Sequence, residues 1–354
     1  MEGHLHPPLV RATKGTPQLL FLQFLPQVLP YIWRRKVSVL GSLLADIFIF
    51  ARSLMSEYNT GIKLLLLLGL VVGAYLLFSL LGMAVGMGAF GVGLDEIMNL
   101  ESYRSIQALK IVQIITTTGV FIVTPFVFVR ILKKDFHSYY KLDQPLNERT
   151  ITIVLFTVLG ALPLIGFMAG LNNAITFPES LSWLEESLRS AEDQAMKVTM
   201  AFLQMETIPE LTYNLVLVAV LPAFGEELLF RGALQKLLID RFRNVHIGIW
   251  TAAIIFSAFH NQFYGFIPRM LLGAAFGYIV VWGGSLWYAI IAHFVNNSVG
   301  VVLHYYVLKN QISPTFEDFG SSPDHLLFVV ISTFIALGGF YLIWFLNTKR
   351  LKES

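Results

Sequence analysis

The chain has 354 residues, of which 55% are hydrophobic and only 14% are charged, and Phe alone accounts for 29 of them. This composition excludes an ordinary soluble protein and favours an integral membrane protein, in which the formal net charge of +2 matters less than where the charges lie. The absence of Cys excludes disulfide bonds, thiolate metal sites and a cysteine nucleophile.

Residues 1–60 are expected to form a cytoplasmic or interfacial segment. The apolar run at 17–33 differs from a signal peptide, because Pro26 and Pro30 interrupt it and the basic residues 34–36 follow it instead of preceding it. We therefore expect this run to lie at the membrane interface.

Eight apolar stretches further along the chain approach or pass the roughly 20 residues that a helix needs to cross a bilayer. The fifth and sixth are short, which predicts tilted helices or helices shielded by other parts of the protein. Pro222 removes a backbone donor from the fourth stretch and predicts a kink there. The expected crossings are 64–90, 108–132, 151–171, 211–239, 247–261, 267–282, 285–305 and 325–346.

The distribution of Lys and Arg orients these crossings. Segments 130–150 and 231–246 and the C-terminal tail are rich in both residues, whereas the alternate loops 91–107 and 306–324 contain one such residue each. The positive-inside rule then places both termini in the cytoplasm, and the expected location is the cell (inner) membrane.

Pairs of glycines four residues apart let helices approach closely in lipid. They fit helix packing within one chain or a homodimer interface, so the protein is expected to be a monomer or a homodimer. The pairs are Gly69/Gly73, Gly82/Gly86, Gly166/Gly170 and Gly273/Gly277.

Residues 177–210 are acidic and amphipathic, and Ser180 or Ser182 can cap a helix there. By the orientation above, this segment lies outside the membrane as a lid, a substrate-docking helix or a long connection, of which we favour the last. The expected parts of the chain are the N-terminal segment 1–60, the first three transmembrane helices in 61–176, the amphipathic segment 177–210, a core at 211–305, and a last transmembrane helix with a basic tail at 306–354.

Ionisable side chains at membrane depth are costly and usually face a partner or a cavity. Glu227 and Arg231 are four residues apart on a helix, so they share a face and can form an ion pair. Glu226 projects about 100° away from Glu227 and has no obvious partner nearby in sequence. Lys63 and Lys110 lie near helix ends, where their side chains can reach the interface, and we expect no role for them at the membrane centre.

Further polar residues lie in the next apolar stretches. His293 and Asn297 are four residues apart and form a pair of hydrogen-bond donors on one helix face, whereas His260 alone can equally be satisfied by an interhelical hydrogen bond. At a rise of 1.5 Å per residue, Glu226 and His260 lie at similar depth, about 20 Å from the loop between their helices. His293 lies somewhat shallower, which favours access from the cytoplasm.

A cavity that combines these groups suits hydrolysis by water. A carboxylate such as Glu226 can act as general base on a water molecule, His260 can hold that water, and a His/Asn pair can donate to an oxyanion. The same side chains can instead bind a divalent metal such as zinc, with Glu226, His260 and His293 as ligands. The HExxH pattern of soluble zinc proteases is absent.

Three motifs in this order resemble those of the CAAX protease and bacteriocin-processing family (CPBP, or Abi), intramembrane proteases that include the type II CAAX prenyl endopeptidases. The motifs cover about residues 210–305, roughly a quarter of the chain. Each motif alone is a weak signal, but three in order on membrane helices are specific. The matching residues are Glu226, Glu227 and Arg231, then Phe256 and His260, then His293 and Asn297.

The resemblance implies an all-α, polytopic membrane protein with about eight transmembrane helices around an intramembrane catalytic cavity. It implies peptide-bond hydrolysis in which Glu226 activates water with help from His260, His293 and Asn297 stabilise the oxyanion, and Glu227 and Arg231 orient the site. Family members are described both with and without a metal. The resemblance therefore implies either no cofactor or a divalent metal such as zinc, and we favour the metal-free form.

The expected partners are a membrane-associated protein or peptide substrate and the lipid bilayer, with no nucleic acid. Nothing in the sequence indicates whether the substrate is prenylated. The alternative is a non-proteolytic membrane scaffold or bacteriocin-immunity protein of the same fold, whose effect would survive Glu226→Gln. A proton-coupled transporter would show inverted repeats or paired broken helices, and the sequence shows neither.

Overall fold

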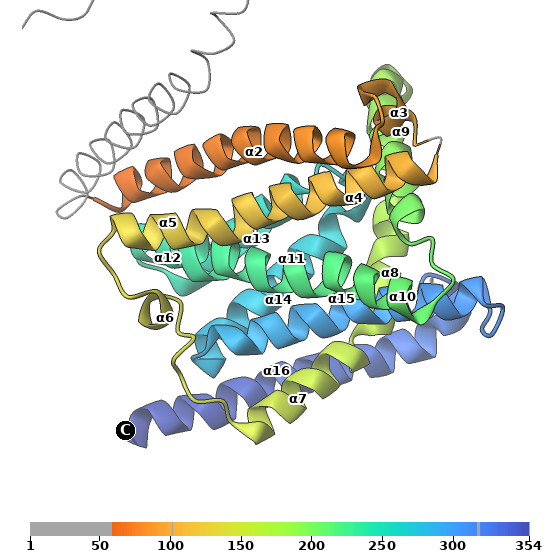
Figure 1. Cartoon of the computed structure of the whole chain (residues 1–354). Helices are drawn as coiled ribbons and strands as arrows, with labels where there is room; N and C mark the ends of the chain where they lie inside the picture. Colours follow the sequence, from red (N-terminus) through yellow and green to blue (C-terminus); the bar gives the residue numbers. More distant parts are fainter. Residues whose placement is uncertain (1–58, 101, 317–318, 354) are drawn as a thin grey trace, which may run out of the picture. The chain divides into compact units, whose positions relative to one another are not determined.

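The structure is a computed structural model that describes residues 59–100, 102–316 and 319–353, with side chains up to Asn347. All of these residues belong to the unit Glu57–Ser354. Within the described ranges the secondary structure is entirely helical (Figure 1). The expected interfacial run at 17–33 lies outside the described residues.

The long helices lie alongside one another, with α2 packed against α4 and α7 packed against α16 (Figure 1). Three π-helical segments and four short 3₁₀ turns interrupt or precede the α-helices. The elements in chain order are α2 (Thr60–Phe90), α3 (Leu94–Asn99), α4 (Tyr103–Thr118), η1 (Gly119–Val123), α5 (Thr124–Ile131), α6 (Phe136–Tyr139), α7 (Glu148–Gly160), α8 (Leu162–Asn173), η2 (Glu179–Leu181), α9 (Ser182–Phe202), α10 (Ile208–Leu215), η3 (Val216–Val220), α11 (Leu221–Glu226), η4 (Glu227–Gln235), α12 (Lys236–Phe242), α13 (Val245–Phe259), η5 (Phe263–Gly265), α14 (Phe266–Gly283), α15 (Leu286–Leu308), η6 (Pro314–Phe316), η7 (Pro323–His325) and α16 (Leu326–Glu353).

The prediction of an all-helical, polytopic membrane protein is confirmed, but the expected number of crossings is not. Among the described residues, six helical stretches are long and apolar enough to cross a membrane, or seven if α7 and α8 form one bent span. The remaining expected crossing, 247–261, corresponds to α13, which has only 15 residues and is too short by this measure. The six stretches are Thr60–Phe90, Tyr103–Ile131, Ile208–Phe242, Phe263–Gly283, Leu286–Leu308 and Pro323–Asn347.

Helix α13 nevertheless connects the same two ends of the bundle as its longer neighbours. At one end the loop after α6 docks on the start of α15, where the Trp287 indole donates to the Leu142 carbonyl at 3.1 Å. We call this the basic end (residues 130–149, 236–244 and 283–288). At the other, the acidic end (residues 91–100, 173–207 and 260–265), the Lys197 ammonium donates to the Asn99 carbonyl. The loops before and after α13 belong to opposite ends, so this short helix also runs from one end of the bundle to the other, with one face buried and the other exposed.

The bend between α7 and α8 has a local cause. Pro163 lies in the first turn of α8, where it supplies no N–H, and the two helices are inclined by 41°. The Ser332 hydroxyl on α16 donates to the Gly160 carbonyl at 2.6 Å and accepts from the Leu164 N–H at 3.1 Å. A side chain of a neighbouring helix therefore satisfies backbone groups that the break leaves free.

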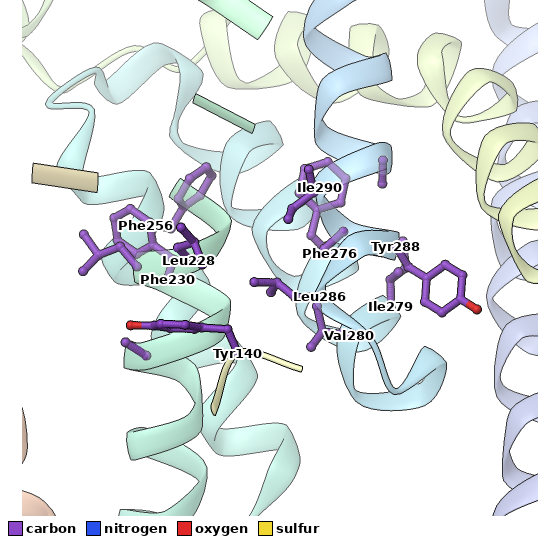
Figure 2. Packing of buried hydrophobic residues seen from close by; sticks show 14 of the residues in the cluster. Tyr140, Leu228, Phe230, Phe256, Phe276, Ile279, Val280, Leu286, Tyr288 and Ile290 are labelled. Atoms are coloured by element: carbon purple, nitrogen blue, oxygen red, sulfur yellow. The ribbon is translucent and has the colours of Figure 1, made fainter. Parts of the chain in front are cut away.

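The buried core lies around the middle of the bundle. Phe230 and Phe256 pack edge to face with ring centroids 5.0 Å apart, and they lie beside Leu228 and Tyr140 in Figure 2. Phe276 belongs to the same cluster. These aromatic residues lie next to the ionisable residues singled out in the sequence.

Three of the four glycine pairs lie at close contacts. A Cβ at Gly86 would lie 2.8 Å from the Ala108 carbonyl oxygen, so this glycine sets the distance between α2 and α4. Gly166/Gly170 faces residues 319–321, and Gly273/Gly277 faces α13 and Gln235. By contrast, a Cβ at Gly69 or Gly73 would meet nothing within 4 Å among the described residues.

The two glycine environments on α2 give a matched test. Gly86→Leu should lower thermal stability, because overpacking at a tight helix contact costs about 1–3 kcal/mol, whereas Gly73→Leu on the open face should not. The melting temperatures of both variants in detergent, relative to the unmodified protein, measure this difference. Equal melting temperatures for the two variants would contradict the close packing of α2 on α4.

Candidate active site

A cavity of about 440 Å³ contains four of the six predicted site residues: Glu226, His260, His293 and Asn297. Glu227 and Arg231 are buried next to it, with 0% and 4% exposure. The structure therefore brings all three sequence motifs together. The other lining residues are Gln113, Thr199, Phe202, Leu217, Val218, Pro222, Phe256, Arg269, Leu272, Phe276 and Asn296.

The Glu227 carboxylate links two helices. Its Oε1 atom accepts from Arg231 Nη1 at 2.7 Å and lies 2.8 Å from His293 Nδ1. Because a carboxylate oxygen can only accept, the proton of this second contact belongs to Nδ1. The predicted Glu227–Arg231 pair is present, and it also fixes the ring of His293, which the sequence did not indicate.

Aromatic rings enclose this pair. The Arg231 guanidinium lies over the Phe256 ring at 4.3 Å and within 5.5 Å of the Phe276 ring, and it donates to the Gly273 carbonyl at 3.2 Å. The Phe276 ring also stacks on His293 at 5.3 Å. A desolvated cation gains from such contacts, and the aromatic wall fixes both partners of Glu227.

Glu226 has a different environment from its neighbour. Its side chain is 12% exposed and lies in the cavity wall, with Oε2 4.0 Å from His293 Nε2. This distance is too long for a hydrogen bond but close enough for electrostatic contact. The prediction that the two adjacent carboxylates point in different directions is confirmed, and the cross-helix neighbour of Glu226 is His293.

His260 directly follows the last residue of α13, and a backbone carbonyl orients its ring. Its Nδ1 atom lies 2.9 Å from the Phe256 carbonyl oxygen, which can only accept, so Nδ1 carries the proton. In the neutral ring, Nε2 is therefore a hydrogen-bond acceptor.

Asn297 is oriented by an irregularity in the helix opposite. Pro222 has no N–H to donate to the Val218 carbonyl four residues earlier, and the Asn297 side-chain amide donates to that oxygen at 3.0 Å. Asn296 donates to Asn297 Oδ1 at 3.2 Å. The π-helical segment η3 ends two residues before Pro222, within one continuous span, and the kink expected at this proline stays a prediction.

Comparison with known proteins identifies the region that holds these motifs. Residues 208–299 match the model of the family "Type II CAAX prenyl endopeptidase Rce1-like". Residues 208–299 form a domain of this family. A stretch of 90 residues is 34% identical to the uncharacterized protein YpbD of Bacillus subtilis (strain 168) and covers 24% of this chain and 43% of that relative. No solved structure matches the chain.

The endopeptidase-like domain, residues 208–299, contains every residue of the three motifs, in agreement with the resemblance read from the sequence. Its boundaries also enclose both walls of the cavity formed by η3 to η4 and by α13 to α15. Helix α9 precedes the domain, yet Thr199 and Phe202 from its last turn line the same cavity.

This contribution of α9 differs from the expected long connection. The cavity wall includes α9 residues of the acidic end and none from the loops of the basic end, so the structure does not support the access from the basic end that we expected. Helix α9 itself is held in place at its start. Glu185 accepts from the Phe177 N–H at 2.8 Å and from Arg189, and these contacts hold the pKa of Glu185 below its ordinary value.

The dismissal of Lys110 was wrong. Its side chain is 3% exposed, and its ammonium donates to Asn214 Oδ1 at 3.0 Å and lies over the ring of Tyr213 at 5.5 Å. The residue reaches a buried partner instead of the interface, because α10 and the end of α9 cover this part of α4. The only feature of the sequence that could have indicated the burial of Lys110 was its position seven residues after the start of α4.

The site residues do not form a metal-binding set. Among the described residues no group of three His, Asp or Glu side chains is arranged to hold a metal ion. The expected ligand set of Glu226, His260 and His293 does not form such a group. Glu227 Oε2 is buried without a hydrogen-bond partner among those residues, but no second and third ligand accompany it. The chemistry below therefore uses protein side chains and water.

The buried ion pair makes a testable contribution to stability. Arg231→Met should destabilise the protein by about 3–5 kcal/mol, because it leaves the Glu227 carboxylate buried without its counter-charge. Adding Glu227→Leu should recover a large part of that loss. Unfolding in detergent of the two single variants and the double variant measures the coupling, and strictly additive losses would contradict the pairing.

Proposed function

We propose that this protein is an intramembrane peptidase that hydrolyses a peptide bond in a membrane-associated protein or peptide. One observation carries the proposal: Glu226, His260, His293 and Asn297, from three separate helical stretches, line a single cavity. The endopeptidase-like domain, which matches a family of prenyl endopeptidases by name, supports the same reaction.

Glu226 is the proposed general base. Its carboxylate lies in the cavity among apolar residues, whereas Glu227 is occupied by Arg231 and His293. A water molecule between Glu226 and the acceptor Nε2 of His260 gives one proton to Glu226. The oxygen of that water molecule then forms a bond to the carbonyl carbon of the peptide.

His293 and Asn297 are the proposed donors to the tetrahedral oxyanion. When His293 carries both protons, Nδ1–H is held by Glu227 and Nε2–H is available to the cavity. One N–H of the Asn297 amide is used on the Val218 carbonyl, and the other is available. Glu226 then returns its proton to the leaving nitrogen, and the C–N bond breaks to give a carboxylic acid and an amine.

Access from the acidic end fits this proposal. The lining residues Thr199 and Phe202 belong to that end, and a volume of about 440 Å³ is large enough for a short peptide segment. If both termini are cytoplasmic, as the charge distribution predicts, this end faces away from the cytoplasm. The substrate would then be a membrane-associated chain that reaches the site from that side.

The first test compares new peptide termini in membranes that express the protein or Glu226→Gln. Fragments should form with the unmodified protein and with the control Glu186→Gln, an exposed residue of α9, and should be absent with Glu226→Gln. Mass spectrometry of enriched termini measures this and names the substrate. Identical termini from all three, with all three folded, would favour the non-proteolytic scaffold or immunity protein.

A second variant tests the oxyanion role. Asn297→Ala should lower kcat by about 10²-fold or more with a smaller change in KM, because the lost donor acts mainly in the transition state. Steady-state kinetics on a substrate found in the first test measure both constants, with the melting temperature as a check on folding. A folded Asn297→Ala variant with unchanged kcat would remove Asn297 from the mechanism.

A further inference from the structure

Arg269 lines the cavity together with Glu226, yet the steps above do not use it. It lies in the first turn of α14, at the acidic end. Its Nη2 atom donates to Gln262 Oε1 at 2.8 Å and its Nη1 atom to the Gln262 carbonyl at 3.4 Å. Both acceptors are neutral, and no carboxylate among the described residues lies within ion-pair distance of this guanidinium.

The guanidinium is held in a defined position. A Cβ at Gly265 would collide with it, so the absence of a side chain there makes room for the cation. The loop that carries both partners is fixed to α9, because Glu192 accepts from the Gln262 amide at 2.9 Å and from the Tyr264 N–H at 3.2 Å. Arg269 is therefore a fixed part of the cavity wall.

Its hydrogen-bonding capacity is only partly used. A guanidinium has five N–H donors in a planar fork, and two of them are used on Gln262, which leaves three without a protein acceptor in the part of the chain that the structure describes. Arg231 gives a contrast within the same domain, since its counter-charge lies at 2.7 Å. A half-buried arginine in a cavity, with free donors and no carboxylate within ion-pair distance, fits the binding of an anion; the charges of Glu192 and Glu226 act on it from further away.

We propose that Arg269 is a specificity-determining residue that binds a carboxylate of the peptide substrate, either the C-terminal carboxylate or an Asp or Glu side chain near the bond that is cut. The inference rests on the proposed function, because it places the peptide against Glu226 in the same cavity. The planar fork of Arg269 matches the two oxygens of a carboxylate, and the low-dielectric cavity strengthens the contact.

Peptide binding to a variant that cannot cleave tests this directly. Immobilised Glu226→Gln protein in detergent is incubated with pooled apolar peptides made in matched pairs. In one set of pairs the C-terminus is either an acid or an amide. In the other set an internal residue is either Asp or Glu, or its neutral counterpart Asn or Gln. Mass spectrometry of the eluate gives the enrichment within each pair. We expect at least about tenfold enrichment of the carboxylate form in one of the two comparisons.

The added substitutions decide whether Arg269 is responsible. Enrichment should disappear with Arg269→Gln, which removes the charge. It should fall with Gly265→Ala, which keeps the charge but displaces the guanidinium. It should persist with the control Arg104→Gln, which changes an exposed arginine at the same end of the bundle. Enrichment in the acid/amide pairs assigns the C-terminus, and enrichment in the Asp/Asn and Glu/Gln pairs assigns a side chain. If Arg269→Gln elutes abnormally in size exclusion, Gly265→Ala alone decides the question.

Two results would overturn the proposal: equal retention within all pairs, or enrichment that survives both Arg269→Gln and Gly265→Ala. Cleavage of the retained peptides by the unmodified protein is scored separately. Selective binding without cleavage would count against the proposed peptidase while leaving the anion site in place, so the two failures are distinguishable.

Discussion

The organisation of this protein depends on one buried carboxylate. Glu227 is fully inaccessible to solvent, and a single oxygen accepts from Arg231 on its own helix and from His293 on α15. A carboxylate in a membrane interior needs such partners, because no water can compensate for its charge there. By meeting this requirement the protein fixes the position of α15 relative to η4 and turns Nε2 of His293 towards Glu226. The adjacent Glu226 is then left in the cavity wall, as its proposed role as general base requires.

Irregular helix geometry supplies the rest of the site. The stretch 208–242 contains two π-helical segments, of which η3 precedes Pro222 and η4 begins at Glu227. Pro222 leaves the Val218 carbonyl without its ordinary donor, and the Asn297 amide takes that place. The same residue that is proposed to bind an oxyanion therefore also joins two helices. Gly225 permits the close approach of this stretch to η1, where a Cβ would lie 2.7 Å from Phe121.

The sequence was informative wherever the relevant contact is local. Glu227 and Arg231 share a helix face by their spacing, and their ion pair could be predicted; the order of the motifs predicted the cavity residues, and the composition predicted the membrane class. Contacts between helices had no such signal. The link from Glu227 to His293 spans 66 positions, and the burial of Lys110 depends on α9 and α10 covering it.

The role of α9 was missed for the same reason. An amphipathic pattern predicts that one face of a helix packs against another part of the protein or the membrane, but it does not identify that partner. The one expected crossing that length does not support is α13, which connects the two ends of the bundle with only 15 residues, one face packed against protein and the other exposed.

The most direct test of this account is the protonation of the His293 ring. In protein labelled with ¹⁵N-histidine and reconstituted in lipid, the His293 signals can be assigned by their loss in His293→Asn. If Glu227 accepts from this ring, Nδ1 carries a proton, and Glu227→Leu removes that constraint and shifts the Nδ1 signal. An Nδ1 without a proton, or signals unaffected by Glu227→Leu, would contradict the arrangement on which the proposed site depends.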